Sequence, residues 1–239
     1  RNITPLTKAM LIPSLVGGMP DWDRLRAIAD RHGLKIIEDS CDTLGGHYRG
    51  RPAGERSDIS VTSFSIFHII TCLGNGGLVA VNDPTLWDRA LMLRAWGRSS
   101  EKFMHGTRQG DSDGRFLEDL GDIEYDAMFI FEELGYGFIP NEAGAAFGHE
   151  QLNKLDMFTQ LRQERFDLHG AYMDRHADVF IKAKVHPDVF TTWICYPVQL
   201  RPELGWSRRA LQMHLEDNGI FTRVIFSGHV ALQPMMHKV

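Results

Sequence analysis

The sequence predicts an α/β fold with a mostly parallel sheet, and three observations support this prediction. Short apolar runs, typical of buried strands, alternate with segments of helical spacing over the first two thirds of the chain. Polar and acidic residues follow several of these runs, at the strand ends where open α/β sheets bind ligands. The composition, 43% hydrophobic and 24% charged, is that of an ordinary globular protein.

The first two thirds of the chain contain the expected elements of this sheet. An acidic first turn and helical spacing predict a helix at 21–31, and Gly33 ends it. Helical spacing recurs at 84–96. Short apolar or β-branched runs predict strands at 9–16, 34–37, 59–65 and 78–81.

The rest of the chain has a different character. Residues 99–125 are polar, glycine-rich and aperiodic, which predicts a long loop of the functional or mobile kind. Residues 142–175 predict one or two long helices, and strands are expected at 192–198 and 221–226 around a helix at 207–218. We therefore expect a large α/β domain in residues 1–150, then a linking helix and a small α+β domain in 151–239.

Both ends of the chain look cut. The chain begins without Met and ends just after an apolar stretch. We therefore expect a chain truncated at both ends, with part of the large domain and part of the small domain missing.

Composition excludes several classes of protein. No uninterrupted apolar run reaches about 18 residues, so we expect no membrane-spanning helix and no membrane partner. The net charge of -5 gives no basic footprint for nucleic acid. Three widely spaced cysteines, Cys41, Cys72 and Cys195, indicate reduced thiols in a cytoplasmic protein. Cysteine and histidine show no paired ligand spacing, so we expect no metal site.

Two polar clusters stand at predicted strand ends, and each has an ordinary structural explanation. An acidic cluster such as 38–42 is most often a solvated loop or a helix cap. His68 stands between Phe67 and Ile69, where a histidine is more often part of the core than a base. The Gly-Asn-Gly-Gly turn at 74–77 shows only that the backbone needs positive φ angles.

Taken together, these segments are much more specific. Residues 37–46 (IEDSCDTLGG) and 57–77 follow the order and spacing of two motifs, IEDAAQAHGA and GDIACFSFxxxKxxxxGxGG. The chain thereby resembles the DegT/DnrJ/StrS family of sugar aminotransferases, which depend on pyridoxal 5'-phosphate (PLP). Further matches at 133–136, 145–148 and 219–223 extend the resemblance over nearly the whole chain. It implies PLP-dependent transferase fold type I, which is aspartate-aminotransferase-like.

The resemblance also implies roles for individual residues. Asp39 matches the carboxylate that keeps the pyridine nitrogen of PLP protonated, and Asp42 falls beside the cofactor ring. Ser63 matches a hydroxyl that binds the cofactor phosphate. The family builds each site from two subunits, so a homodimer is expected. The expected substrate-binding residues are Tyr136, Asn141 and Arg223.

One departure decides which reaction the resemblance implies. The family's Schiff-base lysine is replaced by His68, and no lysine occurs between Lys35 and Lys102. Histidine cannot form an exchangeable imine, but it can move protons near neutral pH. The 3-dehydratase branch, which acts on nucleotide-linked 4-keto-6-deoxyhexoses, has the same change. Segments 12–17, 38–45, 96–98 and 223–228 are also more similar to that branch.

In that branch, pyridoxamine 5'-phosphate (PMP) condenses with the C4 ketone of the sugar. The resemblance implies that His68 abstracts the C4' proton of the cofactor and that the 3-hydroxyl leaves as water. One type of dehydratase also carries an iron–sulfur cluster, but residues 99–125 contain no cysteine. We therefore expect no iron–sulfur cluster, and glutamate as the amino donor that regenerates PMP.

Other departures leave two alternatives open. At four positions the expected family side chain is absent: Asn75, Gly137, Gly144 and Leu232. The first alternative is a family protein of other activity, with a transaminase as the runner-up. The second is a non-catalytic relative in which His68 is a core residue.

Overall fold

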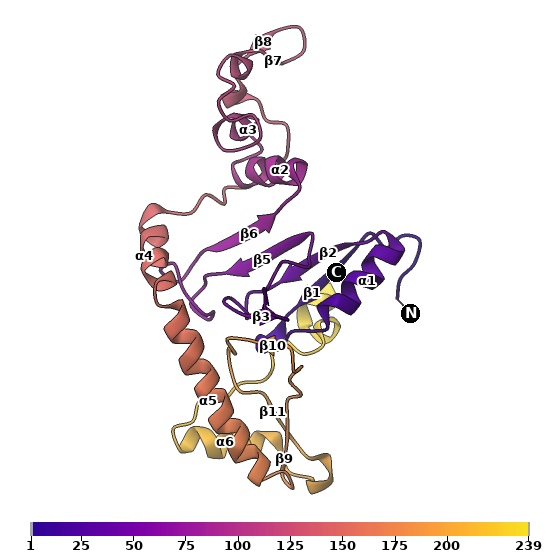
Figure 1. The fold of residues 1–239 in the computed structure, drawn as a ribbon, viewed down its shortest axis with the longest axis vertical. Helices are drawn as coiled ribbons and strands as arrows, with labels where there is room; N and C mark the ends of the chain where they lie inside the picture. Colours follow the sequence, from indigo (N-terminus) through magenta and orange to yellow (C-terminus); the bar gives the residue numbers. More distant parts are fainter. Residues whose placement is uncertain (1, 239) are drawn as a thin grey trace.

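The computed structural model describes residues 2–238, and its centre is a four-stranded sheet. The strands are β1 (Ala9–Pro13), β2 (Lys35–Asp39), β5 (Ile59–Ser63) and β6 (Gly77–Val81), in the order β1-β2-β5-β6. Strands β1, β2 and β5 are parallel, and β6 is antiparallel to β5. The mostly parallel sheet predicted from the sequence is therefore confirmed (Figure 1).

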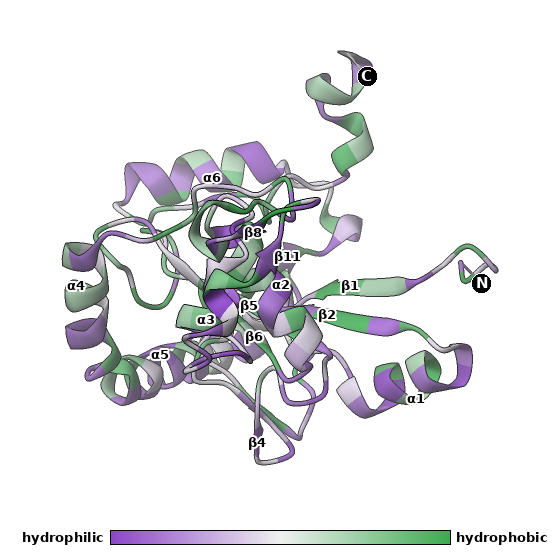
Figure 2. Ribbon diagram, turned by 90° about the horizontal axis from the view of Figure 1, so that it is seen from above, coloured by the Kyte–Doolittle hydropathy of each residue, from purple (hydrophilic) through white to green (hydrophobic). Residues whose placement is uncertain are grey.

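Helix α1 (Trp22–His32) packs on one side of this sheet. The Asp21 side chain caps the helix by accepting the Arg24 N–H, and Gly33, with φ 62°, ends it in the left-handed conformation. Trp22 and Ala29 of α1 are buried with Ile36 of β2 in one core cluster. Figure 2 shows hydrophobic colouring along most of β1, mixed colouring along β2, and alternating hydropathy along the helix beside them.

An arm projects beyond β6 and occupies the upper part of Figure 1. It contains α2 (Pro84–Arg94), α3 (Ser100–Met104) and a hairpin of β7 (Glu118–Asp119) and β8 (Glu124–Tyr125). The prediction of one long loop at 99–125 is therefore wrong in part. Ion pairs between residues 10 and 11 positions apart, Arg108 with Glu118 and Arg115 with Asp126, hold this segment together. Such pairing leaves no periodic signal in the sequence.

The two predicted long helices are α4 (Glu142–Leu152) and α5 (Leu155–Arg175). The predicted domain boundary at 150/151 lies within α4 and stays a prediction. Helix α5 runs past the sheet to the lower part of Figure 1, where β9 (Phe180–Lys182), β11 (Val198–Leu200) and α6 (Arg208–Asp217) lie. Strand β10 (Val189–Phe190) joins β3 (His47–Tyr48) and β4 (Arg51–Pro52) in a separate small sheet. The 3-10 helices are Leu15–Gly17, Gly114–Phe116, Ala127–Phe129, Pro202–Leu204, Val230–Leu232 and Pro234–Lys238.

Two predicted strands of the C-terminal part are wrong. Residues 192–197 form no strand, because the Trp193 ring stacks on Phe166 of α5 with centroids 3.9 Å apart and the backbone turns there with φ 34°. Residues 221–226 are irregular as well, because the Glu216 carboxylate at the end of α6 accepts hydrogen bonds from Thr222. Both segments follow tertiary contacts rather than their β-propensity.

None of the helices within residues 2–238 has the length and apolar character that crossing a membrane requires.

Candidate active site

The sheet brings two predicted residues to the same edge. Asp39 ends β2 opposite Val61 of the parallel strand β5, and β5 ends two residues later at Ser63. The Asp39 Oδ1 atom accepts a hydrogen bond from the Cys41 N–H at 3.1 Å. Both residues therefore lie at the carboxyl ends of parallel strands, where open α/β folds bind ligands.

Asp42 lies in the turn after β2 and is buried. Its Oδ2 atom accepts the backbone N–H of Val16 at 2.9 Å, so it ties the turn after β1 to the turn after β2. Its Oδ1 atom has no hydrogen-bond partner. Burial raises the pKa of Asp42, while the Val16 hydrogen bond and the charge of His68 oppose that shift.

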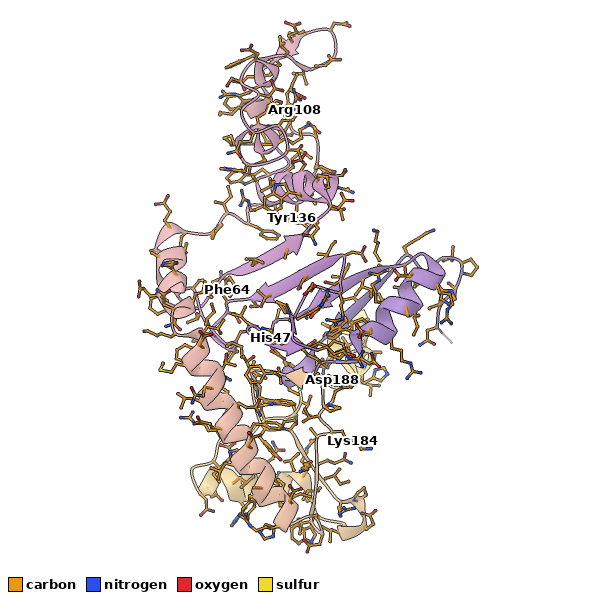
Figure 3. The ribbon with its side chains drawn as sticks, in the orientation of Figure 1. His47, Phe64, Arg108, Tyr136, Lys184 and Asp188 are labelled. Carbon is orange, nitrogen blue, oxygen red and sulfur yellow. The ribbon has the colours of Figure 1, made fainter. Side chains whose placement is uncertain are left out.

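His68 lies on a closed loop between β5 and β6. The loop is held by two backbone hydrogen bonds, from Phe64 N to Gly76 O at 2.9 Å and from Cys72 N to Phe64 O at 3.0 Å. Phe64, labelled in Figure 3, is the residue at which the chain leaves β5. The His68 Nε2 atom is 3.7 Å from the free Oδ1 of Asp42, and its Nδ1 atom is 2.7 Å from the Ser65 Oγ. With 20% of its side chain exposed, His68 is not enclosed in the core.

Helix α4 supports this loop through two glycines that the sequence analysis did not recognise as packing positions. A Cβ atom on Gly148 would lie 2.3 Å from the Cys72 Sγ, and one on Gly144 would lie 3.1 Å from the Cys72 carbonyl oxygen. The glycine at 144, a departure from the family pattern, therefore has a packing reason. The spacing of four residues, which places both on one helix face, is the signal that marks them.

A cavity of about 480 Å³ opens beside His68. Its walls come from the His68 loop, from α5 and from the segment around Trp193. Arg162 of α5 donates from Nη1 to the Trp193 carbonyl oxygen at 2.9 Å. Burial and the nearby positive charge of Arg165 lower the pKa of Arg162. Within residues 2–238, no carboxylate forms an ion pair with either arginine, so this wall of the cavity has an excess of positive charge.

His68, Ser65 and Asp42 form the His68 cluster. Of the three predicted substrate residues, only Arg223 acts electrostatically on this cluster. Its positive charge lowers the pKa of Asp42, against the larger effect of burial. Tyr136 instead stacks on Phe138 with ring centroids 4.9 Å apart, at the base of the arm (Figure 3). Asn141 caps α4 by accepting the Gly144 N–H at 2.6 Å. In the described part of the chain, neither Tyr136 nor Asn141 bonds to the His68 cluster.

The thiols of Cys41 and Cys195 are poor nucleophiles. Burial, followed by the effect of the neighbouring Asp39 carboxylate, raises the pKa of Cys41 to about 12. Burial also raises the pKa of Cys195, although Arg223 opposes that shift. Both side chains are therefore protonated at neutral pH, and no disulfide joins the cysteines of the described residues.

Glu38 is a buried carboxyl group of the acidic cluster 38–42, and the sequence assigns it no role of its own. Its Oε2 atom accepts the Gly54 N–H at 2.9 Å, and its Oε1 atom has no partner. Burial raises the pKa of Glu38 from 4.5 to about 7. Its position two residues after Ile36, on the core face of β2, is the signal that predicts this burial.

This shift predicts that the free energy of unfolding falls as the pH rises. The folded state binds the Glu38 proton more tightly than the unfolded state. The contribution of Glu38 to the free energy of unfolding is therefore complete below pH 4.5 and is lost as the pH rises to about 7. The difference between the unfolded and folded pKa values corresponds to about 3 kcal/mol of unfolding free energy. Glu38→Gln keeps an acceptor for Gly54 and should flatten this decline in a series of melting temperatures between pH 5 and 8. The exposed Glu55→Gln should leave the decline unchanged, and an unaltered decline in Glu38→Gln would contradict the assignment.

Comparisons with known proteins identify the class of fold. The E. coli GDP-4-keto-6-deoxy-D-mannose-3-dehydratase with bound hydrated PLP superposes with a TM-score of 0.82 at 22% identity, over 99% of this chain and 58% of that one. The chain thus has the fold of the PLP-dependent aminotransferases, as the sequence predicts. More particularly, it belongs to the DegT/DnrJ/EryC1/StrS aminotransferase family, whose sequence profile matches residues 1–239.

Relatives of two activities are similar to this chain. It is 28% identical over 239 residues to the lipopolysaccharide biosynthesis protein RfbH of Salmonella typhimurium, covering 99% of this chain and 54% of that protein. It is 29% identical over 230 residues to the GDP-4-keto-6-deoxy-D-mannose 3-dehydratase of Yersinia pseudotuberculosis, covering 95% and 55%. A dTDP-3-amino-3,4,6-trideoxy-alpha-D-glucose transaminase of Streptomyces venezuelae is 44% identical over 112 residues, covering 47% and 29%. The chain spans about half the length of the 3-dehydratase and of RfbH.

Proposed function

We propose that this chain is the site-bearing part of a 3-dehydratase that acts on a nucleotide-linked 4-keto-6-deoxyhexose with PLP or PMP as cofactor. One observation carries the proposal. A histidine with a hydroxyl on one ring nitrogen and a buried carboxylate facing the other occupies the position where the family's aminotransferases have a lysine. This arrangement suits proton transfer and does not suit covalent attachment of an aldehyde.

The residues at the strand ends fit the cofactor chemically. One oxygen of Asp39 accepts the Cys41 N–H, and no N–H group of the described residues donates to the other, so it suits a protonated ring nitrogen. The Ser63 Oγ accepts the Ser65 N–H at 3.2 Å, which leaves its own proton for a phosphate oxygen. When bound, the cofactor supplies an electron sink that stabilises negative charge next to the substrate carbon.

In the proposed reaction, His68 acts through its Nε2 atom as a general base. This atom faces the Oδ1 of Asp42, whose negative charge stabilises the imidazolium that forms when Nε2 takes a proton. Because that Oδ1 has no other hydrogen-bond partner, it is available for this task. The same proton can then be returned to the departing 3-hydroxyl, which leaves as water.

The cavity beside His68 has the charge for an anionic substrate. Arg162 and Arg165 face it without a carboxylate partner in residues 2–238, and two adjacent positive charges repel each other until an anion joins them. A nucleotide diphosphate is such an anion. Glutamate, our proposed amino donor, has carboxylates that meet the same requirement.

We also propose a homodimer, in which Tyr136 and Asn141 act at the partner's site. The loop that carries them exposes apolar side chains, with Leu134 98%, Tyr136 57% and Phe138 68% exposed. Such a surface is typical of a protein interface.

Absorbance spectroscopy of the chain with PLP and then glutamate tests the proposal. We expect PLP to bind and to convert from the aldehyde to the amine form, with no covalent adduct after borohydride reduction. A covalent adduct would instead favour the transaminase alternative, because it would show that a lysine serves as the attachment site. If PLP does not bind at all, both enzymatic interpretations fail and the non-catalytic relative is left.

The same sample serves to identify the reaction product and to measure the molar mass of the protein in solution. With a GDP- or dTDP-linked 4-keto-6-deoxyhexose, mass spectrometry should show loss of one water per sugar. Light scattering should give twice the 27.1 kDa of one chain. A monomer that dehydrates its substrate would contradict the shared site.

A further inference from the structure

The Ser65 side chain is the hydrogen-bond partner that orients the His68 ring. Its Oγ atom lies 2.7 Å from Nδ1, and its carbonyl oxygen accepts the His68 backbone N–H at 3.0 Å. The other ring nitrogen, Nε2, is 3.7 Å from the Asp42 Oδ1, which is longer than a hydrogen bond. Among the described residues, Ser65 therefore holds the only hydrogen bond on this ring.

The loop around His68 needs such a partner on its N-terminal side. Ile69 and Ile70, directly after His68, are buried and anchor the loop to the core. Ile66 and Phe67, directly before it, are 68% and 70% exposed and so contribute little anchoring. Ser65 stands at the start of this exposed turn. Its carbonyl oxygen binds the His68 backbone and its Oγ binds the His68 ring.

We propose that Ser65 is a positioning residue that accepts a hydrogen bond from the Nδ1–H of His68 and so leaves the Nε2 lone pair as the basic atom. Its use in catalysis rests on the function proposed above, whereas the hydrogen bond itself does not. The imidazolium ring carries protons on both nitrogens, so Nδ1 must donate to Ser65 once Nε2 has taken a proton. If Ser65 accepts in the neutral state as well, neither the ring nor the hydroxyl has to turn during proton transfer.

The opposite tautomer would disable the base. If the Ser65 hydroxyl donated to Nδ1, then the neutral ring would carry its proton on Nε2, facing Asp42. Neither ring nitrogen would then have a free lone pair for the substrate. The two arrangements place the ring identically, and they differ only in which nitrogen holds the proton.

The proton position can be measured in the unmodified protein. Long-range ¹H–¹⁵N correlation spectra of the ¹⁵N-histidine-labelled chain report the state of each ring nitrogen, and the His68 signals are those that His68→Asn removes. We expect the neutral His68 ring to be protonated on Nδ1 and free on Nε2. Protonation of the neutral ring on Nε2 would overturn the proposal without any test of activity.

Two substitutions then test the role of the hydroxyl. Ser65→Ala should yield mixed His68 tautomers and lower kcat by about 10- to 100-fold with little change in KM, since it misplaces a base rather than removing a substrate contact. Ser65→Thr keeps the hydroxyl and should restore both the tautomer and kcat. Ser57→Ala, which removes a hydroxyl bonded to the Gly54 carbonyl oxygen, is the matched control and should change neither.

The outcomes separate the two proposals. An Nδ1–H tautomer in a protein that dehydrates no nucleotide sugar would support the role of Ser65 as the orienting acceptor and refute the proposed function. Dehydration at an unchanged rate by Ser65→Ala, with an unchanged tautomer, would refute the role of Ser65 and leave the function standing. The first readout is made on the unmodified protein and needs only His68→Asn for its assignment, so the proposal can be refuted even if Ser65→Ala fails to fold.

Discussion

Replacing His68 with asparagine should lower the kcat of dehydration by about 10²- to 10⁴-fold, which is the usual contribution of a general acid or base. Asparagine is smaller than histidine, but its amide nitrogen falls near the position of Nδ1 and can still bond to the Ser65 Oγ. It cannot take a proton at neutral pH, so the loop should keep its shape while the chemistry stops. Initial-rate measurements on a nucleotide-linked 4-keto-6-deoxyhexose, compared at saturating PMP, would measure the loss.

Cofactor affinity is the internal control for this substitution. The proposed contacts to the cofactor come from Asp39 and Ser63 at the strand ends, so PLP binding should change little in His68→Asn. His47→Asn, on β3, should leave both the rate and PLP binding unchanged, because His47 has no bond to the cluster. Dehydration at the normal rate by His68→Asn would show that His68 is not the base.

The sequence was informative where a site residue is fixed by its position in a strand. Asp39 and Ser63 follow short apolar or β-branched runs, and the parallel register of β2 and β5 then places them at the same edge without further information. His68 is placed by its distance along the chain from Ser63. The family resemblance rests on the same spacing, which is why the family and its fold were both predicted correctly.

The sequence was uninformative where a contact joins distant segments. Nothing local predicts that the backbone N–H of Val16 binds the Asp42 carboxylate, or that Gly148 lets α4 approach Cys72. The same limit explains the strand wrongly predicted at 192–198. Trp193, Ile194 and Tyr196 have high β-propensity. The Trp193 ring nevertheless stacks on Phe166, and Arg162 donates a hydrogen bond to the Trp193 carbonyl oxygen, so the segment takes another conformation.

Asp39→Asn should lower kcat by about 10²-fold or more, and the local structure allows this substitution without disturbing the fold. The amide oxygen of asparagine can still accept the Cys41 N–H that Asp39 Oδ1 accepts at 3.1 Å, so the turn after β2 should be preserved. What disappears is the negative charge that, in the proposed function, keeps the ring nitrogen of the cofactor protonated. Loss of a charge-assisted hydrogen bond of this kind costs about 3 kcal/mol, which corresponds to roughly 10²-fold in rate.

The Cys41 thiol provides a second readout that does not depend on the cofactor. Burial is the main cause of its raised pKa, and Asp39 raises that pKa further through a hydrogen bond and through its charge. Asp39→Asn should therefore lower the pKa of Cys41 and speed its alkylation at alkaline pH, whereas Asp30→Asn, on the exposed side of α1, should not. Faster alkylation with an unchanged dehydration rate would place the Asp39 charge next to Cys41 as the structure has it, and would exclude that charge from the proposed chemistry.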